Sequence, residues 1–147
     1  MQIKFSFLTL LILSVFLSSC NNSPIQNLMK KWQDKDTQYG TNYYLITDYK
    51  FESIYKGNTS YSFNIKDIYW INDAEGIIYG QYTKAHTNTD VGKYYAVSFK
   101  DLTKESISIS GAYKGGVSSA DTLVKAKEEF TIANGYFSIY SSCKAVE

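Results

Sequence analysis

The sequence predicts a mainly β protein, in which one N-terminal helix precedes an antiparallel meander of about eight short strands. Two observations support this prediction. From residue 39 onward, apolar and polar side chains alternate, which is the period of a strand buried on one face. Turn sequences rich in Gly, Asn and Asp separate the alternating runs. A meander of this size has to cover its apolar face, so we expect it to close into a small up-and-down barrel or a strongly curved sheet.

A helix is predicted at the start of the domain. Ser23 is a suitable N-cap, and Pro24 occupies the first helical position, where its missing N–H costs nothing. Apolar side chains then recur at helical spacing, at Ile25, Leu28, Met29 and Trp32. The sequence 34–36, followed by Gly40, is expected to end the helix. The apolar stripe predicts that the helix docks on the core of the domain.

Seven alternating segments follow the helix and are expected to be strands. They are residues 43–47, 50–56, 60–66, 68–71, 77–83, 94–100 and 106–113. Residues 57–59 and 72–76 are turn sequences between them, and residues 84–92 form a polar loop. Residues 115–119 are rich in glycine and serine and are expected to be a flexible link.

A final hairpin is predicted around Asn134-Gly135, because this dipeptide suits a two-residue type I′ turn. In that register Phe130, Ile132, Phe137 and Ile139 share one face, and Ala126 lies opposite Cys143. The same register points Glu128 inward, which disfavours a strand there. Residues 120–128 therefore have two interpretations, a helix capped by Ser119 or a strand from about Val124, and we favour the strand.

The first twenty residues carry an export signal. Lys4 is followed by a 13-residue apolar run, 5–17, which fits a signal-peptide core and is too short for a membrane span. Small residues then precede a cysteine, in Leu17-Ser18-Ser19-Cys20. This stretch resembles the lipobox of bacterial lipoprotein precursors. The resemblance implies cleavage before Cys20, attachment of diacylglycerol to its sulfur and acylation (as by palmitate) of its amine.

The domain organisation follows from this resemblance. Residues 1–19 are the expected signal peptide, residues 20–22 a lipidated tether, and residues 23–147 a single helix-plus-β domain. An anchor with two or more acyl chains holds a protein stably on a membrane without spanning it. Asn21 stands where an Asp would favour the inner membrane in enterobacteria-like sorting. We therefore expect a cell-envelope protein on the outer membrane, facing the periplasm or the cell surface.

The composition disfavours several classes of partner. Without Lys4 the chain has 14 lysines against 14 acidic residues, so the mature protein is close to neutral. Arginine is absent, and with it the planar bidentate grip on phosphate. We expect no nucleic-acid partner and no cofactor.

The evidence for catalysis or a metal site is poor. His86 is the only histidine and lies in a polar loop, whereas zinc sites need several ligands. The acidic pairs Asp34/Asp36 and Asp73/Glu75 occupy predicted helix-end and turn positions, where Asp is expected for local hydrogen bonding. The pair 128–129 needs a surrounding pocket before it could act as acid and base. Lipidation of Cys20 would leave Cys143 without a disulfide partner in the chain. We expect the thiol of Cys143 to be buried and inert. We expect a protein that is not an enzyme.

Three functions remain, and all three use surfaces rather than chemistry. The first is a membrane-anchored protein-binding or inhibitory module, a plan shared by immunity lipoproteins, phage-exclusion lipoproteins and lysozyme inhibitors. Its partner would be an envelope or secreted protein. Tyrosine is abundant, with 14 in the chain, and often contributes binding energy at interfaces. The candidate binding residues are Tyr43, Tyr44, Tyr79, Tyr82, Tyr94 and Tyr95. Adjacent tyrosines on a strand point to opposite faces, so the exposed member of each pair is the candidate.

The other two functions are a carrier and an assembly component. A lipocalin-like carrier would hold a small apolar ligand inside the barrel, in a cavity lined by Phe63, Ile65, Phe99, Phe130, Ile132 and Phe137. So many large aromatic rings favour a filled core instead. An assembly or structural lipoprotein would bind another envelope component. We rank the protein binder first, the assembly component second and the carrier third.

Overall fold

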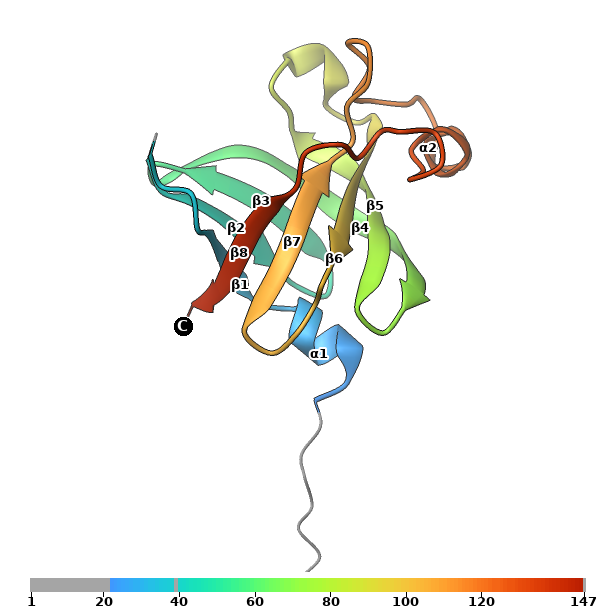
Figure 1. Cartoon of the computed structure of the whole chain (residues 1–147). Coiled ribbons are helices and arrows are strands. Elements are labelled where there is room, and N and C mark those ends of the chain that lie inside the picture. The colour runs from blue at the N-terminus through green and yellow to red at the C-terminus, as the bar shows by residue number, and fades with distance from the viewer. Residues whose placement is uncertain (1–21, 39, 147) are drawn as a thin grey trace, which may run out of the picture.

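The computed structural model describes residues 22–38 and 40–146. Eight antiparallel strands close into a barrel, in which each strand pairs with its neighbours in the sequence and the last strand pairs with the first (Figure 1). The strands are β1 (Lys31–Asp34), β2 (Asn42–Ile46), β3 (Lys50–Tyr55), β4 (Asn58–Asn72), β5 (Glu75–Lys84), β6 (Tyr94–Lys100), β7 (Ser106–Gly111) and β8 (Ser141–Val146). Two short helices, α1 (Pro24–Leu28) and α2 (Leu123–Glu129), and the 3₁₀ turn η1 (Asn88–Asp90) accompany them. The predicted mainly β, up-and-down architecture is confirmed.

The two ends of the barrel carry different connections. At one end, here called the α1 end, lie helix α1, the β2–β3 turn, the β4–β5 turn and the β6–β7 loop. At the opposite end, here called the far end, lie the β3–β4 turn, the loop that contains η1, and the connection from β7 towards α2 (Figure 1). Helix α2 lies outside the wall, beside β5 and β6.

The N-terminal helix is shorter than predicted. It ends at Leu28, and residues 31–34 form strand β1 instead of a further helical turn. Trp32 is the reason for the difference: its ring is fully buried in the barrel, and its Nε1–H donates to the carbonyl of Leu28 over 3.1 Å. The apolar residues from Ile25 to Trp32 therefore do not form one helix. The first of them lie in a helix of one turn, and Trp32 lies in the strand that follows.

Strand β4 joins two predicted strands into one. The segments 60–66 and 68–71 are parts of a single 15-residue strand. Its pairing with β5 shifts between Ile65 and Asp67, which reverses the face on which later side chains lie. This bulge breaks the alternation in the sequence, so one strand looks like two.

The predicted final hairpin is wrong. Residues 123–129 form helix α2, whose N-cap Thr122 accepts a hydrogen bond from the N–H of Lys125. Asn134 does not turn a hairpin: its Nδ2 donates to the carbonyls of Glu128 and Glu129, at 3.0 and 2.9 Å, and so caps the C-terminus of α2. Strand β8 pairs with β7 and β1, and Cys143 lies opposite Ile107 and Asp34 rather than opposite Ala126.

Large aromatic rings fill the interior of the barrel. Phe51 and Phe63 stack with centroids 4.9 Å apart, and Tyr82 stacks on Tyr95 at 4.8 Å. Gly80 faces Phe63, where a methyl group in place of its hydrogen would collide with the ring. At the α1 end the fully buried Leu28 closes the barrel. The expected filled core is therefore found in the lumen.

Candidate functional site

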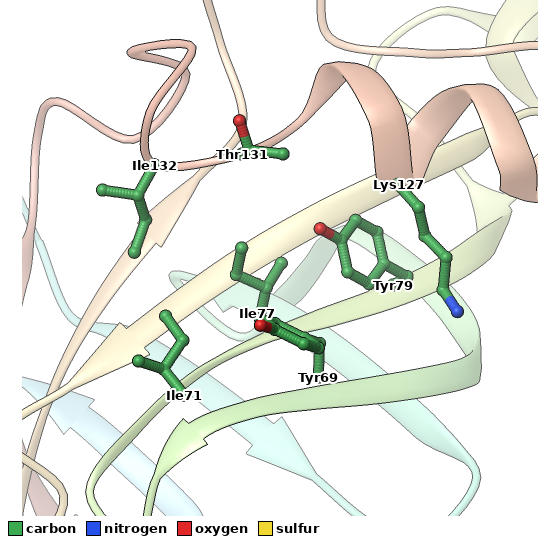
Figure 2. A pocket seen from close by; sticks show the side chains of 7 residues that line it. All are labelled: Tyr69, Ile71, Ile77, Tyr79, Lys127, Thr131 and Ile132. Carbon is green, nitrogen blue, oxygen red and sulfur yellow. The ribbon is translucent and has the colours of Figure 1, made fainter.

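An apolar groove lies on the outer wall of the barrel, between the β4–β5 hairpin and the chain around α2 (Figure 2). Its volume is about 430 Å³. The lining side chains are Tyr69 and Ile71 from β4, Ile77 and Tyr79 from β5, Lys127 from α2, and Thr131 and Ile132 from the segment after α2.

The register of β4 against β5 builds the floor of the groove. Tyr69 pairs with Ile77, and Asp67 pairs with Tyr79, so these four side chains share the outer face of the two strands. Their neighbours point the other way, and Trp70 packs edge-on against Phe99 at 5.1 Å. Ile77 and Tyr79 are each only 3% exposed.

Helix α2 covers only part of this outer face. Its C-cap residue Phe130 is fully buried, and the hydroxyl of Tyr79 donates to the Phe130 carbonyl over 3.0 Å. After Phe130 the chain leaves the outer face of β4 and β5, because Asn134 caps helix α2 and ends it there. Tyr69, Ile71 and Ile132 therefore stay 58%, 44% and 41% exposed. The groove is an incomplete helix-on-sheet interface, with apolar side chains that no described part of the chain covers.

An ion pair closes one end of the groove. Lys127 Nζ lies 2.5 Å from a carboxylate oxygen of Asp67, and both side chains are partly exposed. Burial, with a smaller contribution from the Asp67 carboxylate, raises the pKa of Tyr79 to about 12, so its hydroxyl stays protonated and acts as a donor. The groove therefore offers apolar surface and neutral polar groups, and it has no strong charge of one sign.

The candidate tyrosines do not gather into one surface. Tyr44, Tyr82 and Tyr95 are buried near the far end of the barrel, and burial raises the pKa of each hydroxyl. Tyr43 and Tyr94 are the less buried members of their pairs.

The environments of Tyr43 and Tyr94 differ. Lys31 Nζ lies 4.5 Å from the ring centroid of Tyr43. The backbone of Tyr94 exchanges two hydrogen bonds with that of Ala120, which pairs with the start of β6 as an antiparallel bridge. Only Tyr79 among the six candidates lines the groove.

Sequence reasoning missed Tyr69 and Ile71 as site residues. The signal was present in the run Ile68-Tyr69-Trp70-Ile71, which is apolar on both faces of the strand. Such a run indicates a strand with cover on both sides. Because α2 covers only part of the outer face of β4, the apolar side chains of Tyr69 and Ile71 on that face stay exposed.

The six residues expected to line a carrier cavity lie in different places. Phe63 and Phe99 are fully buried in the barrel. Phe130 is the C-cap of α2, outside the wall, and Phe137 is buried in the connection from α2 to β8. Ile132 lines the groove instead. Ile65 is partly buried against the core. The interior cavity expected for a carrier is replaced by stacked rings.

The polar residues considered for chemistry serve local structure. Asp34 and Asp36 each accept a backbone N–H bond of 3.0 Å in the loop after β1. His86 is exposed, with its ring 5.5 Å from that of Tyr61. Glu129 accepts a hydrogen bond of 2.5 Å from the hydroxyl of Tyr136, and Glu128 is exposed. Over residues 22–38 and 40–146, no three His, Cys, Asp or Glu side chains converge on a point that could hold a metal ion.

Cys143 is buried, as predicted, and its thiol is free. Burial and the nearby carboxylate of Asp34 raise its pKa to about 12, which suppresses the reactive thiolate. In residues 21–147 at pH 8, we expect iodoacetamide to modify Cys143 at least about 100-fold more slowly than in guanidinium-unfolded protein. A Tyr113→Cys variant supplies an accessible thiol as the control. Equal rates at the two cysteines in folded protein would contradict this expectation.

Comparison with protein-family models, with curated proteins and with solved structures found no match to this chain. Within the part of the chain that the structure describes, neither helix has the length and apolar character needed to cross a bilayer. Residues 1–21, which include the stretch that resembles a lipobox, lie outside the described residues.

Proposed function

We propose that this protein is a lipid-anchored, non-catalytic binding module of the bacterial cell envelope, on the outer membrane, which holds another protein through the apolar groove. The partner is an envelope or secreted protein that presents one or two aliphatic or aromatic side chains. One observation supports this choice over the others: the lumen is filled by stacked rings, whereas apolar side chains outside the wall remain uncovered.

The composition of the groove suits a protein partner. Tyr69 supplies a large ring with a polar tip, which is typical of residues that dominate binding energy at interfaces. Ile71 and Ile132 both lie to the left of the buried Ile77 in Figure 2, at the end of the groove away from Lys127. The rest of the groove has no unpaired charge that would have to be desolvated, since Lys127 is held by Asp67.

The groove is also the place to test this function. A photo-crosslinking amino acid at position 71, in the lipidated protein on cells, is expected to capture one protein reproducibly. The same crosslinking amino acid at position 113 is expected to capture none.

Ile71→Asp should then weaken binding of the purified partner by at least about tenfold, because it buries a charge in an apolar contact. Tyr113→Asp, at an exposed site on another face, is the matched control. Equal binding by the two variants would exclude the groove.

A second candidate function is the binding of a small apolar ligand in the groove. The volume of about 430 Å³ falls within the range of small-molecule sites. Native mass spectrometry of residues 21–147 separates the two candidates. A co-purified molecule of reproducible mass that is lost in Ile71→Asp would favour the ligand, whereas a bare monomer would favour the protein partner.

Lipid attachment at Cys20 is tested by fractionation. We expect the wild-type chain to sediment with membranes and Cys20→Ser to lose most of this association, because two or more acyl chains supply the anchor. Ser18→Ala is the control, since a small residue is kept at that position. Membrane association that survives Cys20→Ser would contradict the anchor.

A further inference from the structure

Helix α1 fixes the point at which the tether meets the barrel. Ser23 and Gln26 form a capping box, with the Ser23 N–H donating to Gln26 Oε1 over 3.1 Å and Ser23 Oγ accepting from the Gln26 N–H. The helix is bound to the barrel by the buried side chain of Leu28. Lys30 Nζ adds a bond of 2.7 Å to the carbonyl of Lys104 in the β6–β7 loop. The chain therefore leaves the folded domain at a defined place on the α1 end.

The tether from Cys20 to this place is short. Two residues, Asn21 and Asn22, lie between Cys20 and Ser23, so the chain makes three steps from one to the other. An extended chain covers at most about 3.3–3.6 Å per step, so its reach is about 11 Å. Strand β5 alone has 10 residues and is about 33 Å long at 3.3 Å per residue. A lipid on Cys20 can therefore bring the α1 end to a membrane, but the far end stays away from that surface.

The α1 end also exposes apolar side chains. Ile25 on α1 is 40% exposed, and Tyr49 in the β2–β3 turn is 64% exposed. The strand that leads into this turn is paired with the chain that follows α1, since the Ile46 N–H donates to the carbonyl of Lys30 over 3.0 Å. Tyrosine suits the boundary between headgroups and acyl chains, where the ring is apolar and the hydroxyl stays wet.

We propose that the α1 end of the barrel rests on the membrane that holds the lipid of Cys20, with Ile25 and Tyr49 at the level of the headgroups. This orientation rests on the proposed lipid anchor. The far end, with Tyr113 and Val117, then faces away from the membrane, and the groove opens sideways, where a partner can reach it along the membrane surface.

Charge does not drive this contact. The turns at the α1 end carry the acidic residues Asp48, Asp73, Asp101 and Glu105. The two signs of charge are mixed there, because lysines lie among and beside these turns, at Lys30, Lys31, Lys50, Lys100 and Lys104. Such an end gains nothing from anionic lipids, whose attraction depends on clustered lysine and arginine. The orientation should therefore be the same on neutral phosphatidylcholine as on membranes with added phosphatidylglycerol, and it should not depend on salt.

Site-specific fluorescence quenching tests the orientation. The mature lipidated protein, with Cys143→Ala, receives an environment-sensitive dye at Ile25→Cys or Tyr49→Cys, and at Tyr113→Cys or Val117→Cys as far-end controls. Each form is reconstituted in phosphatidylcholine vesicles that contain a headgroup-labelled quencher lipid. We expect quenching at least about threefold stronger at positions 25 and 49 than at 113 and 117.

The outcomes separate the orientation from the anchor. Flotation with the vesicles measures anchoring independently of the dye. Protein that floats but is quenched equally at both ends, or more strongly at the far end, overturns the orientation and leaves the anchor intact. Protein that does not float overturns the anchor and this orientation with it. A pattern that disappears when phosphatidylglycerol is added would also contradict the proposed contact.

Discussion

Raising the pH from 9 to 11 is expected to unfold the barrel cooperatively. Tyr44, Tyr79, Tyr82 and Tyr95 are each less than a tenth exposed, and burial is the largest cause that raises the pKa of every one of them. Burial also raises the pKa of Tyr61, which packs against Tyr82 and Tyr95. In the unfolded chain the same hydroxyls have an ordinary pKa of about 10. Above that pH the unfolded state loses protons that the folded state keeps.

The sign and size of this effect follow from proton linkage. A raised pKa in the folded state gives stability that is complete below the unfolded-state pKa and is lost as the pH rises towards the folded-state pKa. At pH 11 each of these five tyrosines costs up to about 1.4 kcal/mol, and together they cost up to about 7 kcal/mol. A domain of this size has only about 5–15 kcal/mol of stability, so the loss should unfold much of the protein.

Circular dichroism and tyrosinate absorbance, recorded together against pH, measure this transition. The two signals should change in one cooperative step. Tyr82→Phe with Tyr95→Phe removes two of the five hydroxyls, so the alkaline loss should fall by about two-fifths and the midpoint should move to higher pH. Tyr113→Phe, at an exposed residue, should leave it unchanged. Gradual titration near pH 10 without loss of the fold would refute the expectation.

Gly80→Ala is expected to lower the free energy of unfolding by about 3 kcal/mol or more. An added Cβ would lie 2.6 Å from the carbonyl oxygen of Asn64 and would overlap the ring of Phe63. Neither group can move easily: the carbonyl belongs to the β4–β5 ladder, and the ring is stacked on Phe51. Guanidinium denaturation followed by fluorescence measures the loss.

Two comparisons identify the close contact as the cause. Gly57→Ala adds a methyl group in open space, so only the left-handed backbone, with φ of +80°, opposes it, at a cost of about 1–2 kcal/mol. Phe63→Leu in the Gly80→Ala background should recover part of the loss, so the two changes are less than additive. If Gly80→Ala and Gly57→Ala lowered the free energy of unfolding equally, the ring of Phe63 would have moved aside for the added methyl group, which would contradict this prediction.

Several strands could be predicted because their own residues determine them. Residues 94–100 are rich in aromatic and apolar side chains and stand between turn-forming segments, and β6 has the predicted bounds. The region around Trp32 could not be assigned in the same way. Four apolar residues over eight positions fit one long helix as well as a single helical turn followed by a strand, and only the cavity that receives the indole decides between them.

The last third of the chain shows how a correct local signal can mislead. Asn134-Gly135 does form a turn, and Gly135 has a φ of +75°. The amide of Asn134, however, is held by the last carbonyls of α2, an interaction that depends on a helix packed on the outer wall. The groove could not be predicted either, because it too depends on where α2 packs on the outer wall. Tyr69 becomes a surface residue only because α2 ends at Glu129.

Closure of the barrel between β1 and β8 has a mechanical consequence. Lys31 pairs with Leu45 on one side and with Val146 on the other, so β1 is held along both edges. Force applied through the N-terminal tether passes through α1 into β1 and pulls along the strand axis, which shears both hydrogen-bonded ladders at once. An edge strand peeled sideways would instead lose its bonds one after another. A barrel pulled between the proposed anchor and the proposed partner is therefore loaded in its more resistant direction.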